Sequence, residues 1–158
     1  MQKFQMKLQN LLSSLEKHHK KKLDLSLGRT FNLLNKLGNP QDKLKNVITV
    51  VGTNSKASMC YSLKSILNEA GYKCNMYTSP HLQSYNERFV YNDKEIEEEN
   101  LIELLSDIEK ILGNDNATIF EILTCAFLKY AENFRDNINI IEAGLFHQFD
   151  STNVLRKI

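Results

Sequence analysis

The segment 47–51, Val-Ile-Thr-Val-Val, constrains the fold of this chain more than any other part of the sequence. All five residues are β-branched, and such a short run predicts a strand that is buried on both faces, as in a parallel sheet. Gly52 ends the run, and after a short polar loop apolar residues recur at helical spacing as far as Ala70 and Gly71. A strand that leads through a loop into a helix predicts an α/β unit.

Apolar periodicity predicts elements on both sides of this unit. The helix that ends at Leu37 is followed by Gly38, Asn39 and Pro40, which supply a left-handed cap and a ring that cannot continue the helix. The other predicted elements are helices over 1–17, 30–37, 101–112 and 118–133, strands over 74–77 and 138–141, and a polar surface loop over 92–99.

Alternating helices and strands of this length predict an open, mainly parallel sheet with helices on both faces. The 158 residues fit a single domain, with an amino-terminal helical segment over 1–45 and the alternation of strands and helices over 46–158. If the strands at 47–51 and 74–77 are parallel neighbours, the connection between them is right-handed. Only three strands are clear, fewer than the roughly five or six of an average sheet, so the domain looks truncated.

Composition excludes several classes of function. Twenty basic and nineteen acidic residues give a net charge of +1, which provides no field to attract nucleic acid or an anionic membrane. The basic run 17–22 is either a phosphate contact or, as we favour, a solvated linker or helix end. Without a transmembrane-length apolar run or a signal peptide, the chain is expected to be soluble and cytoplasmic.

The three cysteines, Cys60, Cys74 and Cys125, are odd in number and widely spaced. They form no C-x-x-C pair, so they predict neither a disulfide framework nor a zinc site. Reduced, buried thiols are expected, which suits the cytoplasm.

The loop after the first predicted strand favours phosphate. In an open α/β sheet, ligands bind outside the carboxyl ends of the strands. There the spacing Gly-x-x-x-Lys-x-Ser, from Gly52 to Ser58, resembles a shortened phosphate loop. Backbone N–H groups, a helix dipole and the Lys56 ammonium would all point at one place. The pattern alone is weak, and a plain strand-to-helix turn is the alternative.

Glu142 ends a strand that is expected to be central, where an unpaired carboxylate is costly. One partner is a divalent cation shared with the hydroxyl-rich loop at Thr78 and Ser79 and with a nucleotide phosphate, because Mg²⁺ takes oxygen ligands. The alternatives are that Glu142 caps a helix or pairs with Lys56. The residues alone leave these possibilities open.

Six blocks in the same order resemble the folylpolyglutamate and dihydrofolate synthases, relatives of the Mur ligases. The resemblance extends from about Leu23 to Val154, and the Thr-Ser-Pro-His-Leu and Asp-x-Thr-Asn-Val blocks separate this family from other phosphate-loop proteins. The blocks are Leu37 to Gln41, Gly52 to Ser58, Tyr77 to Leu82, Asn86 to Arg88, Phe120 to Thr124, and Glu142 to Leu145 continuing to Asp150 to Val154.

The resemblance implies a fold like the central domain of a Mur ligase. It also implies an ATP- and Mg²⁺-dependent ligase of folate biosynthesis and one-carbon metabolism. Such an enzyme phosphorylates a carboxylate of a pteroate or folate, and the amine of L-glutamate then displaces the phosphate to form an amide. The expected partners are these small molecules, with no nucleic acid, no membrane and a monomeric state.

By matching position, the resemblance assigns each need of this reaction to residues. Lys56 would offset charge on the transferred phosphoryl group. The resemblance assigns no role to His81 in the signature loop, and we expect it to order that loop through a hydrogen bond. The ATP site would comprise Thr53, Asn54, Ser55 and Lys56; the metal site Ser79 and Glu142; and the pterin pocket Lys22, Leu23, Asp24, Thr118, Ile119, Phe120, Glu121, Phe149, Asp150 and Ser151.

The chain departs from the family where glycines are usual. Ser55 and Ala57 replace glycines of the loop, and Phe146 and His147 replace a glycine pair. If position 55 requires a positive φ, serine there costs about 1–2 kcal/mol, or about tenfold in ATP binding. Phe146 and His147 would either reshape the substrate pocket or block it.

The family's third metal ligand, its carbamate-carrying lysine and its carboxyl-terminal domain are expected to be absent from this chain. We therefore expect no measurable amide ligation by the chain alone. Two explanations remain: a fragment of an active folate ligase, or a catalytically inactive remnant that binds nucleotide and acts as a binding module.

Overall fold

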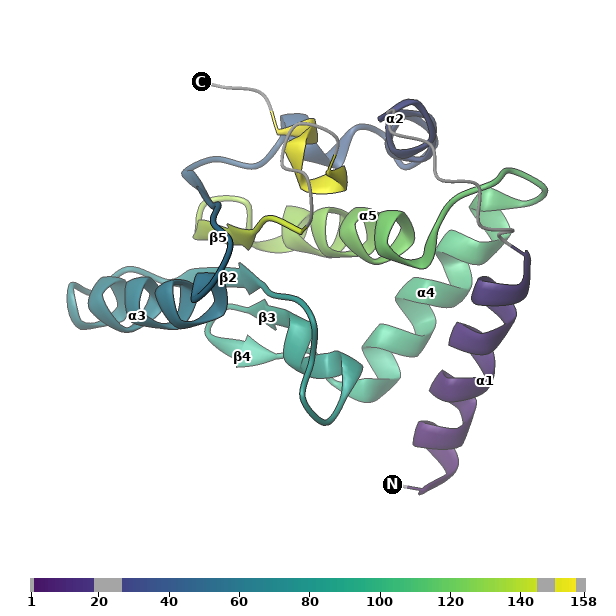
Figure 1. The fold of residues 1–158 in the computed structure, drawn as a ribbon, viewed down its shortest axis with the longest axis horizontal. Coiled ribbons are helices and arrows are strands. Elements are labelled where there is room, and N and C mark those ends of the chain that lie inside the picture. The colour runs from purple at the N-terminus through teal and green to yellow at the C-terminus, as the bar shows by residue number, and fades with distance from the viewer. Residues whose placement is uncertain (1, 19–26, 145–149, 156–158) are drawn as a thin grey trace.

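The fold is a five-stranded sheet between layers of helices, and the computed structural model describes residues 2–18, 27–144 and 150–155 (Figure 1). The strand order is β1-β5-β2-β3-β4. The strands are β1 (Val47–Val50), β2 (Cys74–Tyr77), β3 (Phe89–Tyr91), β4 (Lys94–Glu95) and β5 (Ile138–Glu142).

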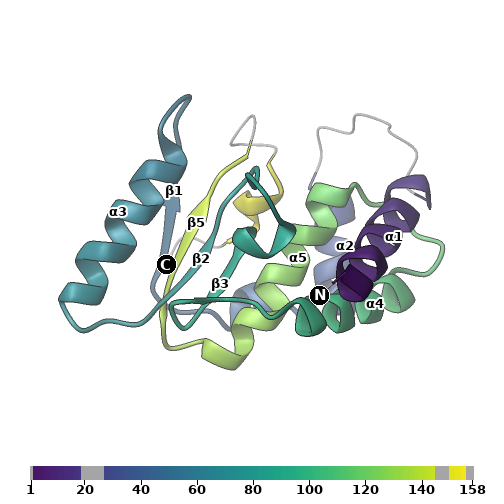
Figure 2. The same cartoon turned by 90° about the horizontal axis from the view of Figure 1, so that it is seen from below.

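Helices cover both faces of the sheet, as predicted. Figure 2 shows α3 on one side of the strands and α5 on the other, with α1, α2 and α4 beyond α5. The helices are α1 (Gln2–His18), α2 (Gly28–Lys36), α3 (Lys56–Glu69), α4 (Glu98–Leu112) and α5 (Ile119–Ala131), with short 3-10 turns η1 (Pro40–Asp42), η2 (Tyr85–Arg88), η3 (Glu132–Phe134) and η5 (Ser151–Val154).

Side chains alternate between two hydrophobic layers along the central strands. Met76 and Ile140 join the layer under α3, whereas Tyr77 and Ile141 join the larger layer that includes α5 and the other helices. A strand with apolar residues on both faces is the pattern that a covered parallel sheet requires.

The helices in the described part of the chain include no segment with the length and apolar character of a membrane span.

The strand β5 lies between β1 and β2 and is parallel to both. The prediction that this strand is central is therefore confirmed. Because β5 separates β1 from β2, these two strands are not neighbours, although the chain passes directly from one to the other through α3.

The predicted count of three strands is wrong, because β3 and β4 form an antiparallel hairpin at one edge of the sheet. The turn between them is Asn92–Asp93, and both residues have positive φ, 49° and 70°. Two consecutive left-handed residues make the type I′ turn that suits the twist of a hairpin. The polar composition of 92–99 hides this turn, and part of the predicted loop is β4 and the start of α4.

The prediction that the segment 47–51 is buried on both faces is also wrong. β1 is an edge strand of the described sheet: Thr49 is exposed and Val51 is 50% exposed. β-branched residues favour edge and central strands alike, so this composition does not distinguish them.

Candidate active site

The carboxyl ends of β1, β5 and β2 meet at one edge of the sheet. Val50 pairs with Glu142, and Tyr77 pairs with Ile141. The N–H of Ala143 donates to the carbonyl of Val50 at 3.0 Å, so β1 and β5 stay aligned to their last residues. The loops that follow these strands therefore start side by side.

The loop after β1 is an exposed turn that ends in the first residue of α3. Thr53, Asn54 and Ser55 are exposed, and Lys56 is half-buried. A Cβ at Gly52 would lie 3.7 Å from Cγ of Lys56, so the lysine side chain folds back over the start of its loop. Loop N–H groups, a helix amino terminus and an ammonium in one place form a setting that suits phosphate.

Ser55 has a left-handed backbone conformation, with φ 61° and ψ 14°. Its carbonyl accepts the N–H of Met59 at 3.0 Å and thereby begins α3. Position 55 therefore has the positive φ at which serine is expected to be strained and glycine is favoured. Serine therefore carries the strain of about 1–2 kcal/mol.

Glu142 and Ser79 are in direct contact. The N–H of Ser79 donates to Oε2 of Glu142 at 2.8 Å, and the glutamate residue is 3% exposed. Oε1 of Glu142 receives no hydrogen bond from any described residue, and no ion pair links Glu142 to Lys56 among those residues. A carboxylate oxygen and the Ser79 hydroxyl remain as hard oxygen donors.

This donor set fits a divalent cation that arrives with its phosphate. The described residues contain no group of three histidine, cysteine or acidic side chains that would hold a metal ion by themselves. Mg²⁺ is usually bound by one or two carboxylates together with substrate phosphates and water. Ser79 and Glu142 therefore suit Mg²⁺ bound with a nucleotide better than a resident metal.

The Cys60 thiol interacts electrostatically with the Glu142 carboxylate. The thiol is fully buried on α3, and burial together with the charge of Glu142 raises its pKa to about 12. Cys60 is therefore a neutral packing residue, as expected for the cysteines. A neutral thiol does not balance the negative charge of the Glu142 carboxylate.

The loop after β2 is ordered by its own side chains. Nε of Arg88 donates to Nδ1 of His81 at 2.9 Å, and burial and the Arg88 charge lower the pKa of His81. A neutral imidazole can accept at Nδ1 in this way. His81 also lies against the ring of Tyr85, with centroids 4.2 Å apart.

Glu87 orders the other half of this loop. Its carboxylate accepts the backbone N–H groups of Leu82, Gln83 and Ser84 at 2.7 to 2.8 Å, and these hydrogen bonds lower the pKa of Glu87. The loop that carries Ser79 thus approaches the sheet edge in one fixed shape.

Phe120 and Asp150 converge on Gly144, two residues after β5. A Cβ at Gly144 would lie 2.8 Å from Cζ of Phe120 and would collide with Oδ2 of Asp150. Oδ1 of Asp150 accepts the N–H of Thr152 at 3.0 Å and the Thr152 hydroxyl at 2.6 Å. Glycine is needed here because two side chains pack directly on the backbone.

Thr118 and Glu121 cap α5 reciprocally. The N–H of Glu121 donates to the Thr118 hydroxyl at 3.2 Å, and the N–H of Thr118 donates to Oε2 of Glu121. Oε1 of Glu121 accepts from Nε of Arg29 at 3.2 Å. Both carboxylate oxygens are therefore engaged within the protein, and a ligand would have to compete for them.

The sequence-predicted site residues form two groups in the structure. In one group Ser79 contacts Glu142, and the loop 53–56 follows the neighbouring strand β1. In the other group Phe120 and Asp150 meet at Gly144, and the remaining predicted residues of 118–121 and Ser151 adjoin these two in the chain. The predicted residues Lys22, Leu23, Asp24 and Phe149, and the departures Phe146 and His147, lie outside the described residues.

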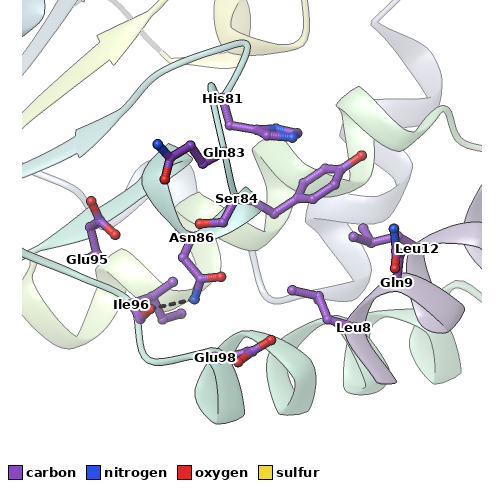
Figure 3. Close-up of a pocket in the computed structure, with 11 residues that line it drawn as sticks. Leu8, Gln9, Leu12, His81, Gln83, Ser84, Asn86, Glu95, Ile96 and Glu98 are labelled. Carbon is purple, nitrogen blue, oxygen red and sulfur yellow. Dashed lines mark hydrogen bonds between the residues drawn. The ribbon is translucent and has the colours of Figure 1, made fainter. Parts of the chain in front are cut away.

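A cavity of about 550 Å³ lies between the loop after β2 and α1 (Figure 3). His81, Gln83 and Asn86 line it from the loop, and Leu8 and Leu12 line it from α1. The described lining includes the carboxylates of Glu95 and Glu98 and no lysine or arginine, so this cavity does not suit phosphate.

Arg29, Glu87 and Arg88 organise both groups, and sequence reasoning gave them no role. Glu87 and Arg88 belong to a block that was quoted for the resemblance, and their place after a predicted strand end is a signal that could have found them. For Arg29 no spacing in the sequence points to Glu121, because the two residues are far apart in the chain.

The chain is similar to known proteins in sequence and in fold. No family model matches the chain. The dihydrofolate synthase/folylpolyglutamate synthase of Escherichia coli (strain K12) is 36% identical over 148 residues, which are 94% of this chain and 35% of that protein. The structure of E. coli FolC in complex with DHPP and ADP matches with a TM-score of 0.86 at 36% identity, over 94% of this chain and 36% of that chain.

A second solved structure gives the same result. The Yersinia pestis bifunctional folylpolyglutamate synthase/dihydrofolate synthase, complexed with AMPPNP and Mn ion, matches with a TM-score of 0.86 at 31% identity, over 94% of this chain and 36% of that chain. The chain thus spans about a third of the length of these relatives. By sequence and by fold, it corresponds to one part, about a third, of the proteins of the folylpolyglutamate synthase/dihydrofolate synthase family.

Proposed function

We propose that this chain is the ATP-binding part of a ligase that joins L-glutamate to a pteroate or folate. Two observations support the proposal: the Lys56 loop follows β1, whose last residue Val50 pairs with Glu142, and the N–H of Ser79 donates to the Glu142 carboxylate. Relatives of the same fold are described in complex with ADP, or with AMPPNP and Mn ion, which supports ATP and a divalent cation, here Mg²⁺.

In this proposal the domain comprises the helical segment 1–45 and the phosphate-loop unit 46–158. Thr53, Asn54 and Ser55 bind the phosphates through their loop, and Lys56 offsets charge on the γ-phosphoryl group, because phosphoryl transfer depends mostly on positioning and electrostatics. Ser79 and Glu142 would hold Mg²⁺, which would supply positive charge to stabilise the triphosphate.

The pteroate or folate is proposed to bind near Gly144. Its pocket would comprise Lys22, Leu23, Asp24, residues 118–121 and residues 149–151. A substrate carboxylate oxygen attacks the γ-phosphorus, and the bond to the β-phosphate oxygen breaks, which gives an acyl phosphate and ADP. The amine of glutamate then attacks the acyl carbon, and the amide forms as phosphate and a proton leave.

Titration of Mg-ATP into the purified chain tests the nucleotide site. We expect Lys56→Ala to weaken binding by about tenfold or more, since a charge-assisted contact is worth about 1.5–3 kcal/mol. Lys64→Ala is the matched control, because it removes the same charge from α3 two turns further along the helix. Equal affinities of the two variants would remove the nucleotide-site proposal.

The metal role has its own experiment. Glu142→Gln keeps an acceptor for the Ser79 N–H but loses the charge. We expect Mg²⁺ to strengthen ATP binding in the wild type and to have little effect in the variant. An equal Mg²⁺ effect in both would exclude Glu142 as a ligand.

A second candidate is a catalytically inactive nucleotide-binding module, which the strained Ser55 favours. Both candidates predict ATP binding, and neither predicts turnover by these 158 residues alone. Because the chain spans about a third of the relatives' length, we expect no glutamate-dependent ADP release from this chain alone. Steady release in the presence of dihydropteroate and glutamate would contradict that expectation and exclude the module. We also propose that the protein is monomeric and located in the cytoplasm.

A further inference from the structure

Arg29 forms a shielded ion pair that links two helices. It lies at the start of α2, and its Nε is 3.2 Å from Oε1 of Glu121, which is the third residue of α5. The two side chains are 19% and 6% exposed. An ion pair with so little solvent contact is screened much less than a surface pair.

The Glu121 carboxylate has a second task in the same place. While Oε1 accepts from Arg29, Oε2 accepts the backbone N–H of Thr118 and so closes the cap of α5. Removing the guanidinium would leave a buried carboxylate with less compensation, which is strongly unfavourable. The carboxylate would then turn toward water, and the first turn of α5 would move with it.

Phe120 lies in that turn, directly before Glu121. Its ring packs against Gly144 so closely that a Cβ there would be 2.8 Å from Cζ, and its centroid is 6.4 Å from that of Tyr77. Asp150 approaches Gly144 beside it. A small rotation of the first turn of α5 would therefore change the space between Phe120, Gly144 and Asp150.

We propose that Arg29 is a positioning residue: through Glu121 it fixes the first turn of α5 and thereby the place of the Phe120 ring beside Gly144 and Asp150. The part of this claim that concerns ligand affinity rests on the proposed function, which places a pterin ring at these residues. The position of the Phe120 ring is independent of the proposed function.

The test uses the full chain labelled with 4-fluorophenylalanine and followed by fluorine NMR. The Phe120 resonance is assigned by its loss in Phe120→Leu. Arg29→Met and Glu121→Gln are expected to shift or broaden that resonance, and the double variant is expected to change it by less than the sum of the two single changes, because both break the Arg29–Glu121 pair. Lys43→Met is the matched control, since Lys43 pairs with Glu132 at the opposite end of α5.

An unchanged Phe120 resonance in Arg29→Met, or an equal change in Lys43→Met, would overturn the proposal. The second readout is affinity: Arg29→Met should weaken dihydropteroate binding, followed by pterin fluorescence, by about tenfold and leave Mg-ATP binding within about twofold. Equal losses for both ligands would indicate general destabilisation and count against Arg29. If the wild type does not bind dihydropteroate, the substrate half of the proposed function fails, and the NMR result still decides the position of Phe120.

Discussion

Ser55 has a strained backbone conformation in the loop that is proposed to bind phosphate. The backbone there has φ 61°, a left-handed conformation that favours glycine over serine. We predict that Ser55→Gly raises the free energy of unfolding or tightens Mg-ATP binding, with a total gain of about 1 kcal/mol. Urea unfolding and ATP titration measure the two parts. A loss in both quantities would show that the serine side chain contributes more than its backbone strain costs.

His81 makes part of the stability dependent on pH. Burial and Arg88 lower its pKa below the ordinary 6.5, so folding favours the neutral imidazole. The unfolded chain then binds more protons than the folded one, and this contribution is present above about pH 6.5 and is lost as the pH falls below it. We predict that wild-type stability decreases in this range more than that of His81→Asn, in which an amide oxygen still accepts from Arg88. Denaturant unfolding across the pH range measures the difference, and equal slopes would contradict it.

At the scale of elements, the β3–β4 hairpin depends on Asp93. Its Oδ1 accepts the N–H of Cys74 at 3.2 Å, its own N–H donates to the carbonyl of Cys74 at 2.9 Å, and its φ is 70°. Asp93→Ala is expected to lower the free energy of unfolding by about 1–3 kcal/mol, because an acceptor is lost and alanine tolerates this conformation poorly. Asp93→Asn keeps both features and should cost clearly less. Equal losses in the two variants would contradict this account of the turn.

The same hairpin shows what the sequence could predict and what it could not. Long periodic helices such as α4 and the apolar strands β2 and β5 were predicted close to their observed bounds, because each buries a continuous face. β3 and β4 are too short for periodicity, and β4 is exposed on both sides. The edge position of β1 depends on which strands pair, and local composition does not encode that.

The candidate site follows the same division. The nearness of Ser79 and Glu142 could be predicted, because both follow or end strands of such a sheet; their role as metal ligands, and that of the loop residues in ATP binding, stay predictions. Arg29 could not be predicted, because its partner Glu121 lies 92 positions away in the chain. A contact of this kind is set by how α2 packs on α5.

At the scale of the whole molecule, the sheet brings together groups that the sequence separates widely. Lys56 begins α3 after β1, Ser79 follows β2, and Glu142 ends β5, and the parallel pairing of the three strands aligns these ends. In the proposed function, Lys56, Ser79 and Glu142 act on one metal-bound triphosphate.

A double-mutant cycle on Mg-ATP affinity tests that claim most directly, with wild type, Lys56→Ala, Glu142→Gln and the double variant. Groups that act on one ligand within a few ångströms couple, whereas distant sites add within about 0.3–0.5 kcal/mol. We predict a coupling free energy larger than that, which disappears when Mg²⁺ is removed. Additive effects, or a coupling that is the same without Mg²⁺, would contradict a shared site.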